Sequence, residues 1–325
     1  MRGTSVCVVT PVFNEGANAR LLVDRLRAVF ADLPYSLRIV MVDDGSRADT
    51  ADLLDALAAE HAMVGVVHFS RNFGHQAALT AGMDHAPADA DAVVVMDSDL
   101  QHPPEVLPEM LRRWEEGADV VYAARVADPT AGLAKRLTSQ GFYRVLAAVS
   151  DHPVPAGAAD FRLMDRKAAS AMRGMRERNR FLRGLSAWVG FRQAAVPYEP
   201  APRAGGQPAY TWRRMLRFAA DGLVSTSSTP LRLGLWAGAL LAAAAVAVAF
   251  AAAALSAPGW AWVVAAVLLV GGIQAALIGA VGVYVGRVLD EARRRPIYVV
   301  RGVAGFLSDR GALVAGSDTF HPPRQ

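Results

Sequence analysis

The sequence contains almost no cysteine and almost no lysine. Cys7 is the single cysteine among 325 residues. No disulfide bond can therefore form within the chain, and nothing indicates an oxidising compartment. Of the 34 basic residues only Lys135 and Lys167 are lysine, and the formal charge is +4. This composition is typical of Arg-rich codon usage, and it also suits phosphate binding, because arginine can bind phosphate through two parallel hydrogen bonds.

Several common functional motifs are absent from the sequence. No Gly-x-Gly-x-x-Gly follows the first predicted strand, which disfavours a dinucleotide site, and there is no Walker A sequence. The basic residues show neither zinc-finger spacing nor interleaving with aromatic residues, so we expect no nucleic-acid partner. The N-terminal apolar stretch, residues 5–13, is short and has no cleavage pattern, which indicates a strand and not a signal peptide.

Short apolar runs alternate with helical patterns over residues 5–160. The runs predict strands at residues 6–9, 37–42, 64–69, 92–96 and 120–123. Apolar residues recur at helical spacing in residues 18–30 and again through Leu53, Leu54 and Leu57. Near-continuous apolar strands that alternate with helices predict an α/β fold, with a mostly parallel sheet covered by helices on both faces.

Two long runs without a charged residue account for the high apolar content of the last third of the chain. Residues 233–255 and 260–286 are each long enough to cross roughly 30 Å of hydrocarbon. We expect a two-helix transmembrane hairpin within residues 231–286; a buried helical hairpin in a soluble protein is the alternative. Arginines flank the pair of runs and none lies between them, so the positive-inside rule predicts a cytoplasmic domain at residues 1–210 and a cytoplasmic tail at residues 287–325.

Two further segments have amphipathic patterns. Residues 135–149 are one, and residues 212–223 are the other. Arginines alternate with apolar residues in the second segment, so we expect residues 211–230 to lie in a membrane interface. A helix that packs on the globular domain is the alternative.

Acidic residues follow three of the predicted strands, at residues 14–15, 43–44 and 97–99. Asp97 and Asp99 point the same way because side chains alternate along an extended chain, and Gln101 adds an oxygen on the same side. Hard oxygen ligands suit Mg²⁺ or Mn²⁺; a merely solvated acidic pair is the alternative. Asp43 and Asp44 could accept hydrogen bonds from a base and a ribose. In the alternative, Ser46 or Asp44 caps the free amides of the helix that follows.

The motifs together resemble family 2 glycosyltransferases of the GT-A fold. They are TPVFNE (residues 10–15), VDDGS (42–46), SRNFGHQ (70–76) and DSDLQHPPE (97–105). DFRLM (160–164) and ERNRFLRG (177–184) narrow the match. With two C-terminal spans, the chain is similar to polyisoprenyl-phosphate glycosyltransferases, which include dolichol-phosphate mannose synthases and bactoprenol glucosyltransferases. The resemblance covers roughly residues 4–290.

The resemblance implies a role for individual positions. The nucleotide sugar would be bound by Pro11, Phe13, Asn14, Glu15, Asp43, Asp44, Asn72, Gly74, Asp97 and Ser98. The acceptor phosphate would be bound by Arg125, Arg136, Ser139 and Arg203. The metal would be bound by Asp97, Asp99 and Gln101, and the catalytic residues would be Asp99, Asp160 and Arg183. Asp160 would lie close to the reacting sugar, although a structural cap or an ion pair with Arg162 is an alternative for it.

The sequence departs from the family pattern at three positions. Phe13 stands where relatives often have tyrosine, which preserves ring stacking and removes a hydroxyl. Ala209 stands at the place of a lysine, so one phosphate contact is missing or is supplied by Arg203. Gly157 falls where relatives often have aspartate. The last two departures concern the acceptor side of the site.

The sequence therefore predicts a bacterial plasma-membrane enzyme with a cytoplasmic catalytic domain. We expect a metal-dependent, inverting transfer of a hexose from a nucleotide sugar, UDP-glucose, to a polyisoprenyl phosphate, undecaprenyl phosphate. A GDP-mannose-dependent mannose synthase and a catalytically dead membrane scaffold are alternatives. A processive polysaccharide synthase would need a Gln-x-x-Arg-Trp motif and more spans. Relatives form oligomers, so a homo-oligomer is also expected.

Overall fold

The computed structural model describes residues 4–126, 158–178, 180–199 and 259–308. The chain divides into two compact units. One comprises Met1–Tyr143, His152–Ala209 and Pro296–Gln325, and the other comprises Arg144–Asp151 and Tyr210–Arg295. The amphipathic segments 135–149 and 212–223 and the first charge-free run, 233–255, lie outside the described residues.

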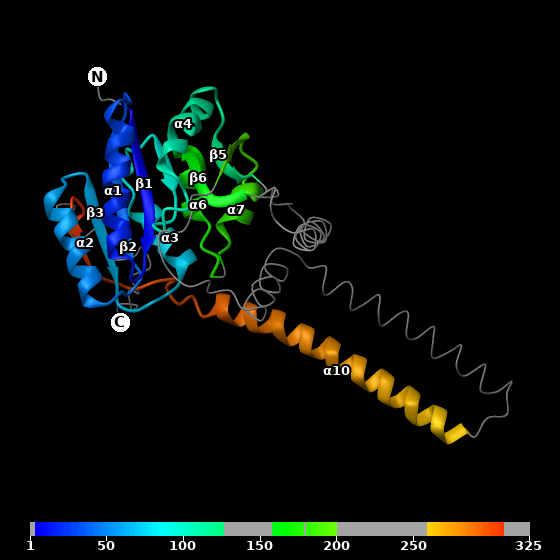
Figure 1. The fold of residues 1–325 in the computed structure, drawn as a ribbon. Coiled ribbons are helices and arrows are strands. Elements are labelled where there is room, and N and C mark those ends of the chain that lie inside the picture. Colours follow the sequence, from blue (N-terminus) through cyan, green and yellow to red (C-terminus); the bar gives the residue numbers. More distant parts are fainter. Residues whose placement is uncertain (1–3, 127–157, 179, 200–258, 309–325) are drawn as a thin grey trace, which may run out of the picture. The chain divides into compact units, whose positions relative to one another are not determined.

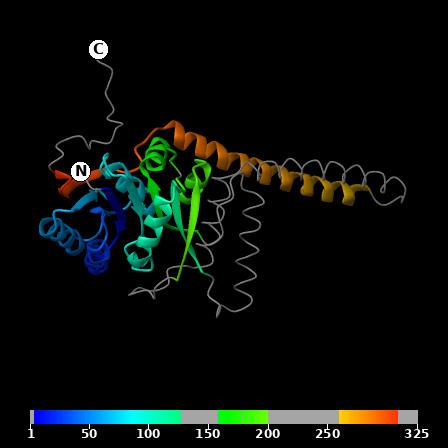
Figure 2. The ribbon, with the colours of Figure 1, turned by 90° about the horizontal axis from the view of Figure 1, so that it is seen from above.

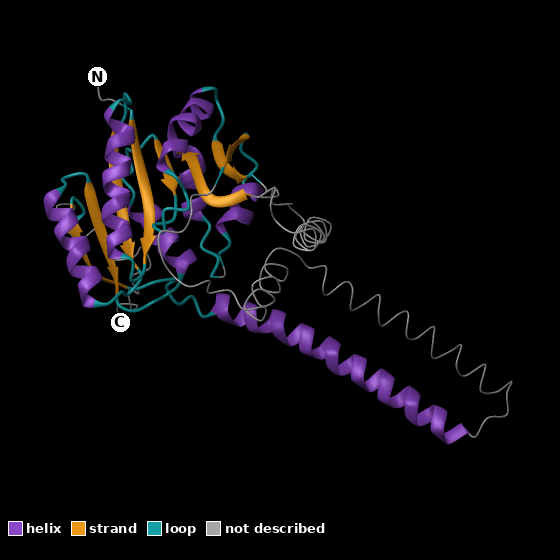
Figure 3. Ribbon diagram, in the orientation of Figure 1, coloured by secondary structure: helices purple, strands orange, loops and turns teal. Residues whose placement is uncertain are grey.

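The first unit is built on an eight-stranded sheet with the order β7-β5-β6-β4-β1-β2-β3-β8 (Figure 3). Its strands are β1 (Ser5–Val12), β2 (Ser36–Asp43), β3 (Val64–Phe69), β4 (Ala92–Val95), β5 (Val120–Arg125), β6 (Ala158–Asp165), β7 (Gln193–Tyr198) and β8 (Val300–Gly305). The central strands β4, β1, β2 and β3 are parallel, and β7 is parallel to β5. β6 runs antiparallel to β4 and β5, and β8 runs antiparallel to β3. The sheet is thus mostly parallel, as the sequence predicts.

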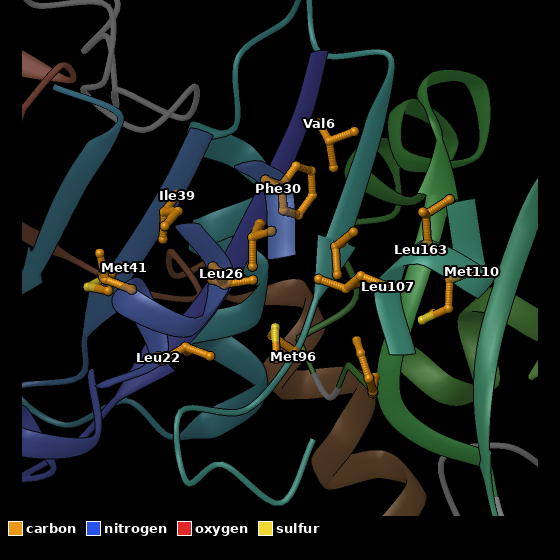
Figure 4. Close-up of a cluster of buried hydrophobic side chains, with 14 of the residues drawn as sticks. Val6, Leu22, Leu26, Phe30, Ile39, Met41, Met96, Leu107, Met110 and Leu163 are labelled. Carbon is orange, nitrogen blue, oxygen red and sulfur yellow. The ribbon is translucent and has the colours of Figure 1, made fainter. Parts of the chain in front are cut away.

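Helices cover both faces of this sheet. They are α1 (Gly16–Ala31), α2 (Ala48–Glu60), α3 (His75–His85), α4 (Leu107–Glu115), α6 (Arg166–Gly174) and α7 (Leu182–Trp188), with a 3₁₀ turn at Pro104–Val106. Along β1, Val6 and Val8 pack with α1, α2 and α4, whereas Cys7 and Val9 pack with α3 and α6. Figure 4 shows part of the first cluster, including Val6. Each fully buried aliphatic side chain of this kind contributes about 1.5–3 kcal/mol.

The five strands and two helices predicted from the sequence are confirmed, and β6, β7 and β8 were not predicted. β6 was missed because Asp160 and Arg162 interrupt its apolar run, although both side chains are buried in the fold. β8 contains two glycines among small residues and has no long apolar run. The segment after Pro296, to which the sequence assigned no role, therefore supplies an edge strand of the sheet.

The second charge-free run forms a single helix. α10 (Gly259–Ala292) extends for 34 residues and contains all of residues 260–286. Within the described ranges, no helix meets the combined length and hydropathy required of a membrane span.

Candidate active site

The predicted site residues gather at one edge of the sheet, where the parallel strands end. Val12 at the end of β1 pairs with Asp43 at the end of β2, and Val9 pairs with Val95 at the end of β4. β6 is antiparallel to β4, with Arg162 opposite Val95, so β6 begins where β4 ends. The loops after β1, β2 and β4 and the first residues of β6 therefore share this edge.

Asp160, near the start of β6, forms a two-pronged ion pair with Arg183 in the first turn of α7. Nε of Arg183 donates to Oδ1 of Asp160 at 2.8 Å, and Nη2 donates to Oδ2 at 2.9 Å. The side chain of Asp160 is only 6% exposed. Burial alone would raise the pKa of Asp160, but His75 and Arg183 outweigh burial and hold this pKa well below its ordinary range. The carboxylate is therefore ionised at neutral pH.

The sequence offered Arg162 as an alternative partner for Asp160, and the geometry corrects this. Arg162 donates instead to the carbonyl oxygens of Ala159 and Leu182 and to the hydroxyl of Ser186. Burial lowers the pKa of Arg162 to about 10, against the attraction of Asp160. Arg162 thus stays protonated at neutral pH and ties β6 to α7.

His75 lies between two acidic residues that the sequence placed in separate motifs. Its Nε2 is 3.3 Å from Oδ1 of Asp97 and 3.7 Å from Oδ2 of Asp160. Burial by itself lowers the pKa of His75, but the two carboxylates outweigh burial and raise this pKa above its usual value. The imidazole therefore adds a partly cationic group to the centre of the site.

The acidic loop after β4 is held by a second histidine. The backbone N–H of Asp97 donates to Nδ1 of His102 at 3.0 Å, and the ring of His102 stacks on Phe161 with centroids 5.2 Å apart. Burial lowers the pKa of His102 despite the nearby carboxylates. The imidazole of His102 is therefore neutral, and its Nδ1 can accept the hydrogen bond from the backbone N–H of Asp97. In the same loop, the backbone N–H of Gln101 donates to Oδ1 of Asp99 at 3.1 Å.

The oxygen atoms of this loop fit a hard cation only in part. Oδ1 of Asp97 is buried and makes no hydrogen bond to any described residue, and its close cationic neighbour is Nε2 of His75 at 3.3 Å, so a metal ion that bound this oxygen would take the place of that contact. Carboxylates such as those of Asp97 and Asp99 suit Mg²⁺ or Mn²⁺, which commonly take their remaining ligands from substrate phosphates and water. Among the residues that the structure describes, no group of three His, Cys, Asp or Glu side chains could hold a metal ion by itself.

Asp43 and Asp44 are both used to fix neighbouring loops. Oδ2 of Asp43 accepts from Nδ1 of His68 and Oδ1 accepts from the backbone N–H of Ser46, each at 2.8 Å. The carboxylate of Asp44 accepts from the backbone N–H groups of Phe73 at 2.6 Å and Gly74 at 3.0 Å. The capping alternative is therefore wrong for both residues. No described side chain caps the start of α2; Oγ of Ser46 accepts from the backbone N–H of Asn14, and the amides that Asp44 binds precede α3.

These contacts shift the pKa values of the two carboxyl groups in opposite directions. Burial raises the pKa of Asp43, but hydrogen bonds from His68 and Ser46 outweigh burial, and its pKa falls below the usual value. For Asp44, burial outweighs the amides of Phe73 and Gly74, and its pKa rises. Asp43 is therefore the more firmly ionised of the pair.

The loop after β1 completes the same edge. The backbone N–H of Asn14 donates to Oγ of Ser46 at 3.0 Å, and Oδ1 of Asn14 accepts from the backbone N–H of Arg47 at 3.0 Å. Oγ of Ser98 lies 3.5 Å from Oε2 of Glu15, which links this loop to the acidic loop. The ring of Phe13 is 47% exposed, so it offers an apolar surface at this edge.

The remaining predicted positions divide into two groups. Pro11 is buried within β1, Asn72 and Gly74 lie in the loop before α3, and Arg125 ends β5 at the edge where β6 begins. The predicted acceptor-side residues Arg136, Ser139 and Arg203 lie outside the described residues, as do Gly157 and Ala209.

Three histidines of the site have no role in the sequence-based prediction. His75 and His102 stand inside motifs that were recognised, so their positions beside the predicted ligands could have indicated them. His68 ends an apolar strand. Only the pairing of β2 with β3, which sets Asp43 opposite His68, reveals its contact.

Comparisons with known proteins identify the family of the chain. Residues 7–173 match the family described as Glycosyl transferase family 2. The chain is 38% identical to the uncharacterized glycosyltransferase YkcC of Bacillus subtilis, over 93% of this chain and 95% of that protein. It is 34% identical to the bactoprenol glucosyl transferase of Shigella phage SfV, over 91% of this chain and 98% of that protein. Among solved structures, the mannosyltransferase PcManGT from Pyrobaculum calidifontis, in complex with GDP-Man and Mn²⁺, is 19% identical with a TM-score of 0.47, and covers 83% of this chain and 87% of that chain.

Proposed function

The chain belongs to glycosyltransferase family 2, and from this membership we propose that it transfers a hexose from a nucleotide sugar to a polyisoprenyl phosphate. The expected donor is UDP-glucose and the expected acceptor is undecaprenyl phosphate. Support for this choice comes from relatives named bactoprenol glucosyl transferase, which are 34% identical over about nine-tenths of the chain. The observation that carries the proposal is the cluster of Asp97, His75, Asp160 and Arg183 at the carboxyl edge of the sheet.

The donor nucleotide would lie on the loops after β1 and β2. Phe13 presents an exposed ring on which a base can stack. Asp43 and Asp44 hold the loops around it in place through His68, Phe73 and Gly74. Both carboxylates already accept hydrogen bonds from the protein, so we assign them to shaping the nucleotide site, with Asn14 and Glu15 nearer the ligand.

The diphosphate of the donor would lie at the acidic loop. Asp97 and Asp99, with Gln101, are the residues that would hold Mg²⁺ or Mn²⁺. A bound divalent ion neutralises the charge that develops on the leaving nucleoside diphosphate. His102 supports this arrangement because it fixes the backbone of Asp97 from below the loop.

The acceptor phosphate needs to be oriented toward the donor sugar more than it needs a base to remove a proton. A phosphate monoester has a second pKa of about 6 and is therefore largely dianionic at neutral pH. One of its oxygens attacks the anomeric carbon as the bond from that carbon to the diphosphate breaks, and the leaving diphosphate takes the bonding electrons with inversion. Asp160 is already ionised and paired, so its role is to hold Arg183 toward the anionic groups and not to accept a proton. Arg125, Arg136, Ser139 and Arg203 are the expected contacts of the lipid phosphate.

We place the enzyme at a bacterial plasma membrane with its catalytic domain in the cytoplasm. The charge-free runs 233–255 and 260–286 support this placement, as do the arginines on both sides of the pair. On α10, the side chains of Trp260 and Ile278 are 75% and 72% exposed, so the helix has large apolar side chains left for a lipid environment. A C-terminal tag that is accessible only from outside the cell would contradict this topology.

A donor screen tests the proposed function. The full chain would be incubated with radiolabelled UDP-glucose, UDP-galactose, GDP-mannose or UDP-N-acetylglucosamine, a short polyprenyl phosphate and Mn²⁺, and the lipid fraction would be counted. We expect labelled lipid from UDP-glucose. Label from GDP-mannose alone would favour the mannose synthase, and no label from any donor would favour the inactive scaffold.

A further inference from the structure

A cavity lies between α2 and the edge strand β8, and His68, which binds Asp43 of the candidate site, forms part of its wall. Its volume is about 520 Å³, within the range of small-molecule sites in proteins. Asp55 and Ala58 of α2 and His68 of β3 line it on one side, and Arg301, Gly302 and Ser308 line it on the other. In Figures 1 and 2 the red strand β8 lies beside α2 and β3.

Small residues on α2 and on β8 leave room for the cavity. Ala58 and Ala59 face it from α2, and glycine occupies position 302 of β8. A Cβ atom added at Gly302 would meet nothing within 4 Å. Gly302 has no positive φ angle, so a larger side chain is compatible with the strand there. The space is therefore open at a position where the backbone does not require glycine.

A β-bulge directs a charged side chain toward this cavity. His68 pairs with Gly302, but the next residue of β3, Phe69, pairs with Val300, so Arg301 is an extra residue in β8. A bulge re-aims side chains and brings two successive residues to the same side of a strand. Arg301 thus joins Gly302 on the face that carries His68, and both line the cavity.

The polar groups at the cavity suit a ligand with one anionic group and several hydroxyls. The guanidinium of Arg301 is a preferred partner for phosphate, and Ser308 adds a hydroxyl. Asp55 uses Oδ1 to accept from Nε2 of His68 at 3.0 Å, and an ionised carboxylate can accept further hydrogen bonds from sugar hydroxyls. We propose that the cavity binds a phosphate monoester of a polyhydroxyl compound, either a sugar phosphate or the ribose phosphate of a nucleotide.

The same cavity is connected to the nucleotide loops by three residues. Asp55 contacts His68, His68 contacts Asp43 at 2.8 Å, and Asp43 holds the backbone of Ser46 at 2.8 Å. Hydroxyls of a ligand that donate to the carboxylate of Asp55 draw on its negative charge and so weaken its hydrogen bond from His68. The hold of His68 on Asp43 then changes, so occupancy of the cavity weakens nucleotide binding at the active site. Coupling of this kind typically changes affinity roughly fivefold or more.

Equilibrium dialysis of the full chain tests the site without any need for turnover, so its outcome does not depend on the proposed sugar or acceptor. The probes are glucose 1-phosphate and UMP. Gly302→Leu fills the cavity, Arg301→Gln removes the anion partner, and Asp99→Asn disables the catalytic site while leaving the cavity intact. Thermal unfolding of each variant checks that it folds. If Gly302→Leu does not fold, Arg301→Gln still tests the proposal, because Arg301 is exposed.

The two sources of phosphate give different results. If a sugar phosphate is the ligand, one glucose 1-phosphate binds per chain. This binding is retained in Asp99→Asn and lost in Gly302→Leu. If a nucleotide is the ligand, UMP binds twice in the wild type and once in Gly302→Leu. In either case Arg301→Gln weakens binding roughly tenfold or more, because a charged hydrogen bond is lost. The proposal is overturned if neither probe loses a site in Gly302→Leu and Arg301→Gln.

The coupling has its own measurement. UDP affinity is determined with and without saturating glucose 1-phosphate, in the wild type and in Asp55→Asn. We expect the sugar phosphate to weaken UDP binding roughly fivefold in the wild type and not in the variant. Equal UDP affinity with and without bound sugar phosphate would contradict the connection through His68.

Discussion

Arg183 holds Asp160 through two parallel hydrogen bonds, at 2.8 Å and 2.9 Å, across the junction of β6 and α7. This fork geometry fixes the direction of the guanidinium as well as its distance. Nε2 of His75 lies 3.7 Å from Oδ2 of the same carboxylate. Asp160 is therefore ionised and hydrogen-bonded through both oxygens, and we propose that it orients cationic side chains and does not act as a general base.

The first prediction concerns Arg183→Lys. Lysine keeps the charge but cannot form the two-pronged contact with Asp160. Because misplacement of an orienting group by about 1 Å can cost about 100-fold in rate, we expect kcat to fall by roughly that factor while the donor KM changes little. Arg27→Lys, on the exposed face of α1, is the matched control and should be neutral. Near-normal kcat in Arg183→Lys would show that Asp160 does not act through Arg183.

The second prediction concerns His75. Its imidazole separates the carboxylates of Asp97 and Asp160, so its loss leaves two negative groups facing each other. We expect His75→Phe to lower kcat/KM roughly 100-fold, and His75→Gln, which keeps a hydrogen-bond donor, to lower it only about tenfold. Steady-state kinetics with varied donor and varied acceptor measure this. Equal losses in the two variants would mean that the donor group of His75 is irrelevant.

The sequence predicts the parallel centre of the sheet better than the strands that flank it. The mostly parallel sheet with helices on both faces follows from the apolar runs, and the structure confirms it. β6 and the edge strand β8 were not predicted, because β6 buries Asp160 and Arg162 and β8 contains two glycines and no long apolar run. Such strands form because they pair with strands that are distant in sequence, and the local residue pattern does not predict this pairing.

Partners of site residues are also hard to predict from the chain. Asp43 and Asp44 are adjacent in sequence, yet Asp43 binds His68 from β3 whereas Asp44 binds the loop before α3. For Asp160 the near neighbour Arg162 was an obvious candidate, because residues two apart share a face of a strand. The position of α7 instead brings Arg183 to Asp160. Contacts between residues far apart in sequence depend on packing, which motifs do not encode.

The third prediction is a pH dependence of stability at His68. Contacts with Asp43 and Asp55 outweigh burial and raise the pKa of His68, so its stabilising contribution is complete below the unfolded value of about 6.5 and is lost as pH rises through the raised folded value. Asp43 has a lowered pKa, so its contribution is present above the unfolded value and is lost as pH falls through the folded value. The contact therefore stabilises most at mildly acidic to neutral pH.

Urea unfolding of the wild type and His68→Phe measures this dependence. The difference in unfolding free energy should be larger at about pH 5.5 than at about pH 9. Asp55→Asn serves as a milder variant, because Asp55 is half-exposed and supplies only one of the two contacts. A difference that stays constant or grows toward pH 9 would contradict a cationic His68.

The fourth prediction concerns Gly45, in the loop after β2. Its φ is +71°, and an added Cβ would lie 2.5 Å from the carbonyl carbon of Arg71 and 2.6 Å from the backbone nitrogen of Asn72. Gly45→Ala should therefore cost about 1–3 kcal/mol of stability from backbone strain alone and raise the donor KM, because it separates the two nucleotide loops. Gly174→Ala, where a Cβ meets nothing within 4 Å, is the control and should be neutral. Unchanged stability and donor KM in Gly45→Ala would mean that the loops need not meet.

The most direct test of the account is the metal-dependent formation of glucosyl lipid by the purified full chain. Radiolabelled UDP-glucose and a short polyprenyl phosphate are incubated with Mn²⁺ or with EDTA, using the wild type and Asp99→Ala. We predict labelled lipid only in the wild type with metal, and a loss of at least about 100-fold in Asp99→Ala, as is typical when a charge-stabilising group is removed. Labelled lipid formed at a near-normal rate by Asp99→Ala, or by the wild type in EDTA, would contradict the account.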